Sequence, residues 1–365
     1  MIFNLKNKLK NKQPLEVRPI RDELKELEEL LKKLGQSIEN NHPNINYFSQ
    51  RFREHELMKL NIKTLGYHIG HTLYSAREKE QHQLTAPEPI KLKSKLCTQS
   101  DIESNWFSFW ANELKTKPIY HRKIWEFCYI AQALYSFGKL KTGTQGIGFG
   151  CGQEPLPSLF AKYGAHVIAT DLPEKEAANL GWVNTEQHAK NIHLLRRPDI
   201  CPNIEQLNLI ELEYVDMNHI PRRYNRQFDF CWSSCSLEHL GSIDHGFNFI
   251  ENSLKTLRPG GVAVHTTEFN LDTLGPTIDN WPTVLYQEKH IQDFYSELVN
   301  QGYDVAELDL SHGSDILDGF IDIPPYEWNN ETYKPQYGQL APAHLRLAID
   351  GIPCTSIGLI ICKPE

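Results

Sequence analysis

From about residue 143 to the C-terminus, short apolar runs alternate with segments whose apolar residues recur at helical spacing. This alternation constrains the fold more than any other feature, because repeated strand–helix units favour a largely parallel sheet with helices on both faces. The sequence therefore predicts an α/β fold. The expected strands are 145–149, 165–170, 210–215, 227–233, 261–268, 303–309 and 356–362.

The helices between these strands carry start and stop signals. Pro155 is placed to open the first helix and Gly164 to end it, the usual positions of proline and glycine at helix ends. Apolar residues at spacings of three and four predict two more helices, at 243–257 and 291–298, and Gly302 follows the second.

Two further regions precede the α/β domain, which we place at 141–365 with a substrate-lid insertion around 311–355. Residues 1–45 form a charged N-terminal helical extension, and 46–140 a helical, aromatic-rich region that packs on or caps the ligand site. The apolar stripe of the extension either packs on the protein's own body or pairs with a second copy. It consists of Leu24, Leu27, Leu31 and Leu34.

The bulk composition excludes several classes of protein. A formal net charge of -8 disfavours general nucleic-acid binding. No signal peptide or run of about 18 apolar residues appears, so we expect a cytoplasmic protein without a transmembrane segment. Lys6, Lys8, Lys10 and Lys12 either touch anionic lipid peripherally or form a solvated tail. None of the 8 cysteines forms a CxxC pair, which disfavours a zinc site and favours reduced thiols.

A glycine-rich turn after the first strand is the leading candidate for ligand binding. Gly148, Gly150 and Gly152 follow a G-x-G-x-G pattern, and glycine allows close backbone approach and positive φ. The dinucleotide fingerprint G-x-G-x-x-G would need glycine at 153, where the chain has Gln153. A dehydrogenase is therefore disfavoured, although a purely structural turn would look similar.

Two carboxylates end the next strands. Asp171 follows a strand 23 residues after Gly148, where a carboxylate accepts both ribose hydroxyls in dinucleotide-binding folds; alternatively it caps the next helix. Asp216 is placed to accept an adenine amino group, with Met217 against the ring, or is a plain loop aspartate.

Together these pieces resemble the class I S-adenosylmethionine (SAM)-dependent methyltransferases over roughly 140–270. The matching motifs are GFGCGQEPLP, the strand-end Asp171, FDFCWSSCSLEHL and LRPGG. The resemblance implies a Rossmann-like seven-stranded mixed sheet with the last strand antiparallel, and SAM as cofactor. The donor contacts that we expect are Gly148, Phe149, Gly150, Gly152, Glu154, Asp171, Leu172, Asp216, Met217 and Ser233. The first strand departs from the pattern, since it is poor in branched apolar residues.

A narrower resemblance covers more of the chain. The stretches TQSDIESNWFSFW, YHRKIWEF, VHTTEFN and HLRLAIDGIPCTSIGLII are similar to bacterial methyltransferases associated with surface-glycan biosynthesis. It implies that 97–137 belongs to the catalytic unit and that His121 and Arg122 meet the carboxylate of the donor.

Methyl transfer from a sulfonium is an in-line displacement, and an alcohol acceptor benefits from a base. His239 follows strand 227–233 and is one candidate base, although it could instead orient a helix. His265 and Glu268 lie on opposite faces of their strand, and Glu268, nearer its end, is the second candidate. We expect Glu238 to hold structure. No ligand spacing demands a metal, so none is predicted, although a divalent ion held by carboxylate and histidine is an alternative.

The insertion around 311–355 is rich in aromatic residues, which suit a carbohydrate because sugar C–H faces stack on rings; a lid of other specificity is the alternative. They are Tyr326, Trp328, Tyr333 and Tyr337. We therefore expect O-methylation of a sugar or glycan intermediate. The alternatives are methylation of a lipid, a small metabolite or a protein, and a non-catalytic scaffold that oligomerises through its N-terminal helix.

Overall fold

The computed structural model of the protein describes residues 47–78, 86–179, 188–324, 326 and 343–365, together with positions 25, 29, 38–39 and 42–43. Two compact units divide the chain, Met1–Ile62 and Lys63–Glu365. The predicted boundaries after residues 45 and 140 stay predictions. Several predicted features lie outside the described residues, namely the early lysines, the leucine stripe, Trp328, Tyr333 and Tyr337.

The first unit contains a short antiparallel pair and the beginning of a long helix. Strand β1 (Ile38–Glu39) pairs with β2 (His42–Pro43), and α2 (Tyr47–Glu78) follows. Phe52 and Leu57 on this part of α2 are exposed.

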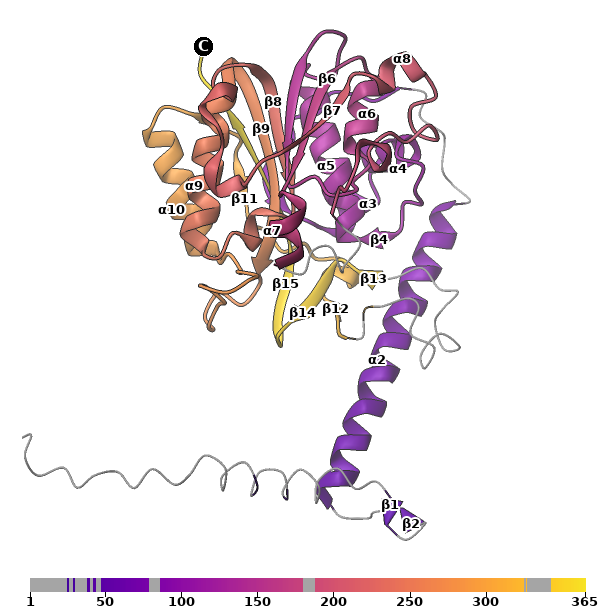
Figure 1. The fold of residues 1–365 in the computed structure, drawn as a ribbon. Coiled ribbons are helices and arrows are strands. Elements are labelled where there is room, and N and C mark those ends of the chain that lie inside the picture. The colour runs from indigo at the N-terminus through magenta and orange to yellow at the C-terminus, as the bar shows by residue number, and fades with distance from the viewer. Residues whose placement is uncertain are drawn as a thin grey trace, which may run out of the picture. The chain divides into compact units, whose positions relative to one another are not determined.

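The second unit is built around a mixed sheet with the strand order β11-β3-β15-β9-β8-β5-β6-β7 (Figure 1). Its central strands run parallel, and β15 (Ile352–Cys362) runs antiparallel to β9 over nine residue pairs. The predicted parallel α/β sheet with an antiparallel last strand is therefore confirmed. The parallel strands are β5 (Gln145–Phe149), β6 (His166–Asp171), β7 (Ile210–Tyr214), β8 (Phe228–Ser234) and β9 (Leu257–Asn270).

Within the described residues the sheet contains 11 strands instead of the expected seven. The region expected to be helical contributes β3 (Ser94–Leu96), which pairs with β15 on one side and with β11 (Leu308–Asp309) on the other. Leu92, Ser94 and Leu96 are buried while Lys93 and Lys95 between them are partly exposed, a period of two that marks a strand. The predicted strand 303–309 is divided into β10 (Asp304–Val305) and β11. The remaining additions are β12 (Ile321–Asp322) and β14 (Arg346–Ile349).

A second small sheet lies outside the main one. In it β4 (Tyr120–His121) pairs in parallel with β13 (Ala343–His344), so two distant parts of the chain meet immediately before α5 (Arg122–Ser136).

Helices cover both faces of the sheet, as the alternating pattern predicts (Figure 1). On one face lie α9 (Ile243–Thr256) and α10 (Glu288–Asn300), and on the other α4 (Asn105–Glu113), α5 and α6 (Leu156–Lys162). Phe249, Ile250 and Leu254 of α9 are buried against the strands, and each contributes about 1.5–3 kcal/mol to stability. The short helices are α3 (Gln99–Ile102), α7 (Glu174–Asn179) and α8 (Ile204–Leu207).

The predicted helix stops are confirmed. Gly164 follows α6 with φ +83° and Gly302 follows α10 with φ +89°, values that L side chains rarely adopt. The first strand, despite its composition, spans the expected five residues.

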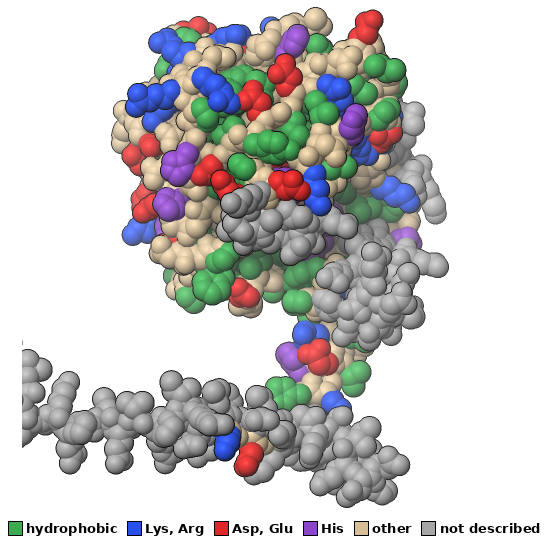
Figure 2. All heavy atoms as spheres, viewed as in Figure 1, with side chains coloured by type: hydrophobic (Ala, Val, Ile, Leu, Met, Phe, Trp, Pro, Cys, Tyr) green, Lys and Arg blue, Asp and Glu red, His purple; other side chains and the backbone are tan. Residues whose placement is uncertain are grey.

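Acidic and basic side chains are interspersed on the face shown in Figure 2. All eight thiols are free. Among the helices that the structure describes, none is both long and apolar enough to cross a membrane.

Candidate active site

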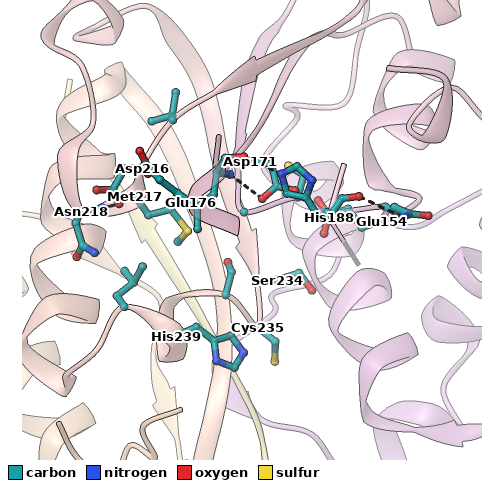
Figure 3. A pocket seen from close by; sticks show the side chains of 18 of the residues that line it. Glu154, Asp171, Glu176, His188, Asp216, Met217, Asn218, Ser234, Cys235 and His239 are labelled. Atoms are coloured by element: carbon teal, nitrogen blue, oxygen red, sulfur yellow. Dashed lines mark hydrogen bonds between the residues drawn. The ribbon is translucent and has the colours of Figure 1, made fainter. Parts of the chain in front are cut away.

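A cavity of about 670 Å³ opens at the carboxyl ends of β5, β6, β7 and β8 (Figure 3). Ligands of open α/β sheets bind at this edge, and the volume lies within the range of small-molecule sites. Eight residues predicted from the sequence line it: Gly150, Gly152, Glu154, Asp171, Leu172, Asp216, Met217 and His239.

The glycine turn forms one wall of the cavity. Gly150 and Gly152 have φ of +60° and +52°. A Cβ on Gly150 would lie 2.7 Å from the Cβ of Ser236 and 3.0 Å from the Sδ of Met217, so a side chain would fill the cavity wall. Gly148 and Phe149 lie beneath the turn and do not line the cavity, and a Cβ on Gly148 would overlap the indole of Trp232. The turn thus leaves space for a ligand to approach the backbone.

Asp171 ends β6 and reaches the cavity. Its Oδ1 accepts a hydrogen bond from Leu172 N at 2.8 Å and its Oδ2 one from Ala189 N at 2.9 Å. Neither donor belongs to α7, so these bonds do not cap that helix. Each carboxylate oxygen retains acceptor capacity, as binding to two ribose hydroxyls requires.

Asp216 both caps a turn and lines the cavity. Its Oδ1 accepts from Asn218 N at 2.9 Å, and its Oδ2 lies 2.6 Å from Nδ1 of His219. The buried Met217 follows, with its sulfur toward Gly150. An apolar sulfur beside a carboxylate suits one face and one edge of an adenine ring.

Glu154 is a buried acid in the cavity wall. It is 8% exposed, and its Oε1 accepts a hydrogen bond from Trp232 Nε1 at 2.6 Å. Burial raises the pKa of Glu154 to about 8, although the indole bond opposes this shift. A ligand ammonium group in this corner would stabilise the ionised carboxylate, which fits the amino group of SAM.

Ser233 does not reach the cavity. Its Oγ lies 2.8 Å from Nδ1 of His265, whose Nε2 lies 3.1 Å from Ser253 Oγ. Burial lowers the pKa of His265 to about 3, so this histidine is a neutral core residue. The cavity is lined instead by the following Ser234, Cys235 and Ser236, because the strand extends one residue beyond its expected end.

His121 and Arg122 also point elsewhere. His121 accepts from Lys123 N at 3.1 Å at the start of α5, and its ring lies 4.8 Å from that of His344. Arg122 pairs with Glu268 and with Glu126. The next residue, Lys123, lines the cavity, so the predicted basic cluster contributes a different side chain. Donor contacts of the predicted residues stay predictions.

His239 lies on a different side of the cavity from Asp171 and Asp216 (Figure 3). Its Nδ1 lies 3.0 Å from the carbonyl oxygen of Pro282. Because a carbonyl only accepts, Nδ1 carries the proton and Nε2 the lone pair. Burial lowers the pKa of His239, which keeps the imidazole neutral and suited to accepting a proton.

Glu268 lies on β9, on the face opposite His265 as expected, but it does not line the cavity. Arg122 Nη2 lies 2.5 Å from its Oε1, and its buried Oε2 has no hydrogen-bond partner among the described residues. Burial raises the pKa of Glu268 to about 7, although Arg122 opposes the shift.

The sequence did not predict several other residues that line the cavity. Those next to the glycine turn could have been predicted, since they belong to the same motif. The missed residues are Lys123, Phe127, Cys151, Gln153, Pro155, Glu176, His188, Val215, Asn218, Ser234, Cys235, Ser236 and Leu240.

Residues 147–265 match the family model described as Methyltransferase domain. No curated protein matches the chain.

Solved structures resemble the chain at low identity. Phosphoethanolamine N-methyltransferase 2 of Haemonchus contortus is 14% identical, with a TM-score of 0.38, over 64% of this chain and 52% of that one. An S-adenosylmethionine-dependent methyltransferase from Mesorhizobium loti is 15% identical, with a TM-score of 0.34, over 63% of this chain and 96% of that one. The chain thus spans about half the length of the first of these structures. Residues 147–265 are thus similar to a methyltransferase domain, the class of protein whose motifs the sequence also resembles.

Proposed function

We propose that the chain transfers a methyl group from SAM to a hydroxyl group of a sugar or glycan intermediate. One observation carries this proposal: a single cavity extends from the glycine turn to the neutral His239. Bound SAM supplies an activated methyl group on its sulfonium. The residues around the cavity bind the donor, orient the acceptor and accept its proton.

The donor half of the cavity has a complementary group for each part of SAM. Asp171 binds the ribose hydroxyls, and Asp216 with Met217 binds the adenine. The carboxylate of Glu154 binds the α-ammonium group. Gly150 keeps the wall open, since a side chain there would reach Ser236 and Met217.

His239 acts as the base. Its Nε2 lone pair accepts the proton of the acceptor hydroxyl as the methyl–oxygen bond forms, and Pro282 fixes the ring through Nδ1–H. Placing the hydroxyl in line with the methyl group supplies most of the rate enhancement, because a displacement requires alignment.

A sugar acceptor is supported by an exposed aromatic residue next in sequence to the hydrogen-bond partner of this base. Trp281 is 60% exposed and directly precedes Pro282, the partner of His239. An exposed indole offers a flat apolar surface to the C–H face of a sugar. Tyr326, predicted for this role, is engaged in packing, since its hydroxyl donates to the Ala348 carbonyl at 2.5 Å. The similarity of several motifs to surface-glycan methyltransferases points the same way.

The test incubates the purified chain with methyl-labelled SAM and a panel of nucleotide sugars and cell-envelope glycans, followed by mass spectrometry. We expect a labelled O-methyl sugar, its formation slowed at least 100-fold by His239→Gln and unchanged by His166→Gln, a matched substitution of an exposed histidine. A labelled methyl group on a lipid, small metabolite or protein instead would show that the acceptor is not a sugar. Failure to bind SAM by calorimetry would contradict the enzymatic function and favour a scaffold.

A further inference from the structure

Three side chains of types that bind metal ions lie together beside His239. Cys235 and Glu238 follow β8, and Glu268 lies near the end of the neighbouring β9. One ligand atom from each lies within 4.8 Å of the others. Such separations allow all three atoms to contact one ion, since metal–ligand distances are about 2.0–2.3 Å.

Two carboxylate oxygens in this cluster are buried without a hydrogen bond from the described residues. Oε1 of Glu238 and Oε2 of Glu268 are buried and accept no hydrogen bond from the residues that the structure describes. The side chains are 0% and 5% exposed. Native proteins rarely leave buried carboxylate oxygens unsatisfied, so two in one place indicate an absent ligand that carries positive charge or donates hydrogen bonds.

The other oxygen of each carboxylate is held by the protein. Thr267 Oγ1 donates to Oε2 of Glu238 at 3.0 Å, and Arg122 Nη2 donates to Oε1 of Glu268. These bonds fix both carboxylates and leave the unpartnered oxygens available. The same division of labour, with one atom ligating and the other held by a neighbour, surrounds metal ions in proteins.

His239 lies beside this cluster. Its Nε2 lies 4.0 Å from Oε1 of Glu238, and the carbonyl of Pro282 holds its Nδ1. A backbone carbonyl on the second ring nitrogen is the usual support of a ligating histidine. Cys235 and His239 both line the 670 Å³ cavity, which gives an ion a path of entry.

We propose that Cys235, Glu238 and Glu268 bind a single divalent transition-metal ion, with one coordination position open toward His239 and the cavity. Thiolate and carboxylate ligands together select an ion of the zinc class over magnesium, which prefers oxygen ligands alone. The thiol loses its proton on binding; in the structure it donates to Oε1 of Glu126 at 2.9 Å. The sequence predicts no metal because the ligands lie on two strand ends about 30 residues apart, outside any short motif.

Binding of the ion does not depend on the proposed function, but the role of the ion in the reaction does. An acceptor hydroxyl at the open position would be polarised and would lose its proton to His239 more readily.

The test is metal analysis of the full-length chain. After dialysis against Zn²⁺, we expect about one zinc per chain by mass spectrometry. Glu238→Gln and Cys235→Ser should weaken binding at least tenfold, as substitutions in ligand sets do. Cys362→Ser, at the far end of β15, is the matched control and should bind zinc as the native chain does. X-ray absorption should show one sulfur ligand near 2.3 Å that is absent from Cys235→Ser.

Zinc that stays bound after Glu238→Gln, or a chain that binds none, would overturn the proposal, and unfolding curves establish that each variant is folded. Calorimetry with SAM separates this proposal from the proposed function. Donor binding without zinc binding refutes the metal site alone, whereas zinc binding without methyl transfer to any acceptor refutes the function and leaves the site standing.

Discussion

Glu154→Gln tests whether burying the Glu154 carboxylate in the cavity wall lowers the stability of the fold in the absence of SAM. In the structure, Glu154 is 8% exposed, its Oε1 accepts a hydrogen bond from Trp232 Nε1, and burial raises its pKa from 4.5 to about 8. Glutamine keeps an oxygen for the indole and removes the ionisable group, so the substitution isolates the charge.

The magnitude follows from the difference between the folded and unfolded states. Between pH 4.5 and 8 the unfolded chain has released this proton while the folded chain retains it, so stability falls as pH rises. Each pH unit costs about 1.4 kcal/mol, which gives about 3 kcal/mol at pH 7 and about 5 kcal/mol above pH 8. In the absence of SAM, Glu154→Gln should remove this pH-dependent loss of stability, so the variant should be more stable than the native chain at pH 8.

Urea unfolding of the donor-free chain at pH 5, 7 and 9 measures the effect, with Glu205→Gln, an exposed glutamate on α8, as the control. The native chain and the control should lose stability as pH rises, and Glu154→Gln should lose about 3 kcal/mol less between pH 5 and 7. A variant whose stability follows the same pH slope as the native chain would refute the reasoning.

The same residue should couple donor binding to pH. Because an ammonium stabilises the carboxylate, SAM binding at pH 7 should release a proton from Glu154, measured by calorimetry in buffers of different ionisation enthalpy. Glu154→Gln should bind SAM at least tenfold more weakly with that proton release abolished. Equal release by the variant would place the donor's ammonium elsewhere.

Three other substitutions test separate parts of the structure. Asp171→Ala should abolish SAM affinity by calorimetry while the circular dichroism spectrum stays native; unchanged affinity would show the ribose assignment to be wrong. Asp322→Ala should cost about 3–5 kcal/mol in urea unfolding, because it leaves the buried ammonium of Lys63, 2.7 Å away, without its carboxylate, and a loss below 1 kcal/mol would speak against this. Burial lowers the pKa of His265 to about 3, so between pH 6.5 and 3 the unfolded chain takes up a proton that the folded chain does not, and the folded chain loses stability. His265→Leu should remove this part of the acid loss of stability. An unaltered slope of stability against pH would contradict a neutral buried imidazole.

The sequence predicts those parts of the fold that depend on local pattern. Strand 145–149 has the expected bounds, and glycine ends α6 and α10, because apolar periodicity and backbone conformation are local properties. The extra strand β3 was missed: it consists of three residues and gains its stability from β15 and β11, which lie far away in the sequence.

For the site, the sequence identifies motifs better than side-chain directions. It places a basic residue at the start of α5, but rotation by one residue along a helix decides whether Arg122 or Lys123 faces the cavity. In the same way, one more residue of β8 moves the cavity lining from Ser233 to Ser234. The cluster of Cys235, Glu238 and Glu268 depends on the register of β8 beside β9, which no short motif encodes.

The pairing of β3 with β15 also sets the order in which the protein can fold. Leu96 lies opposite Ile357, so this side of the sheet is completed only when two segments that lie far apart in the sequence meet. Contacts between such distant residues form slowly, because a long loop must close first. Until then β15 and its neighbour offer unpaired backbone groups to other chains. A fragment that starts after residue 140 would keep that edge open permanently and should aggregate, although it contains the whole segment 147–265.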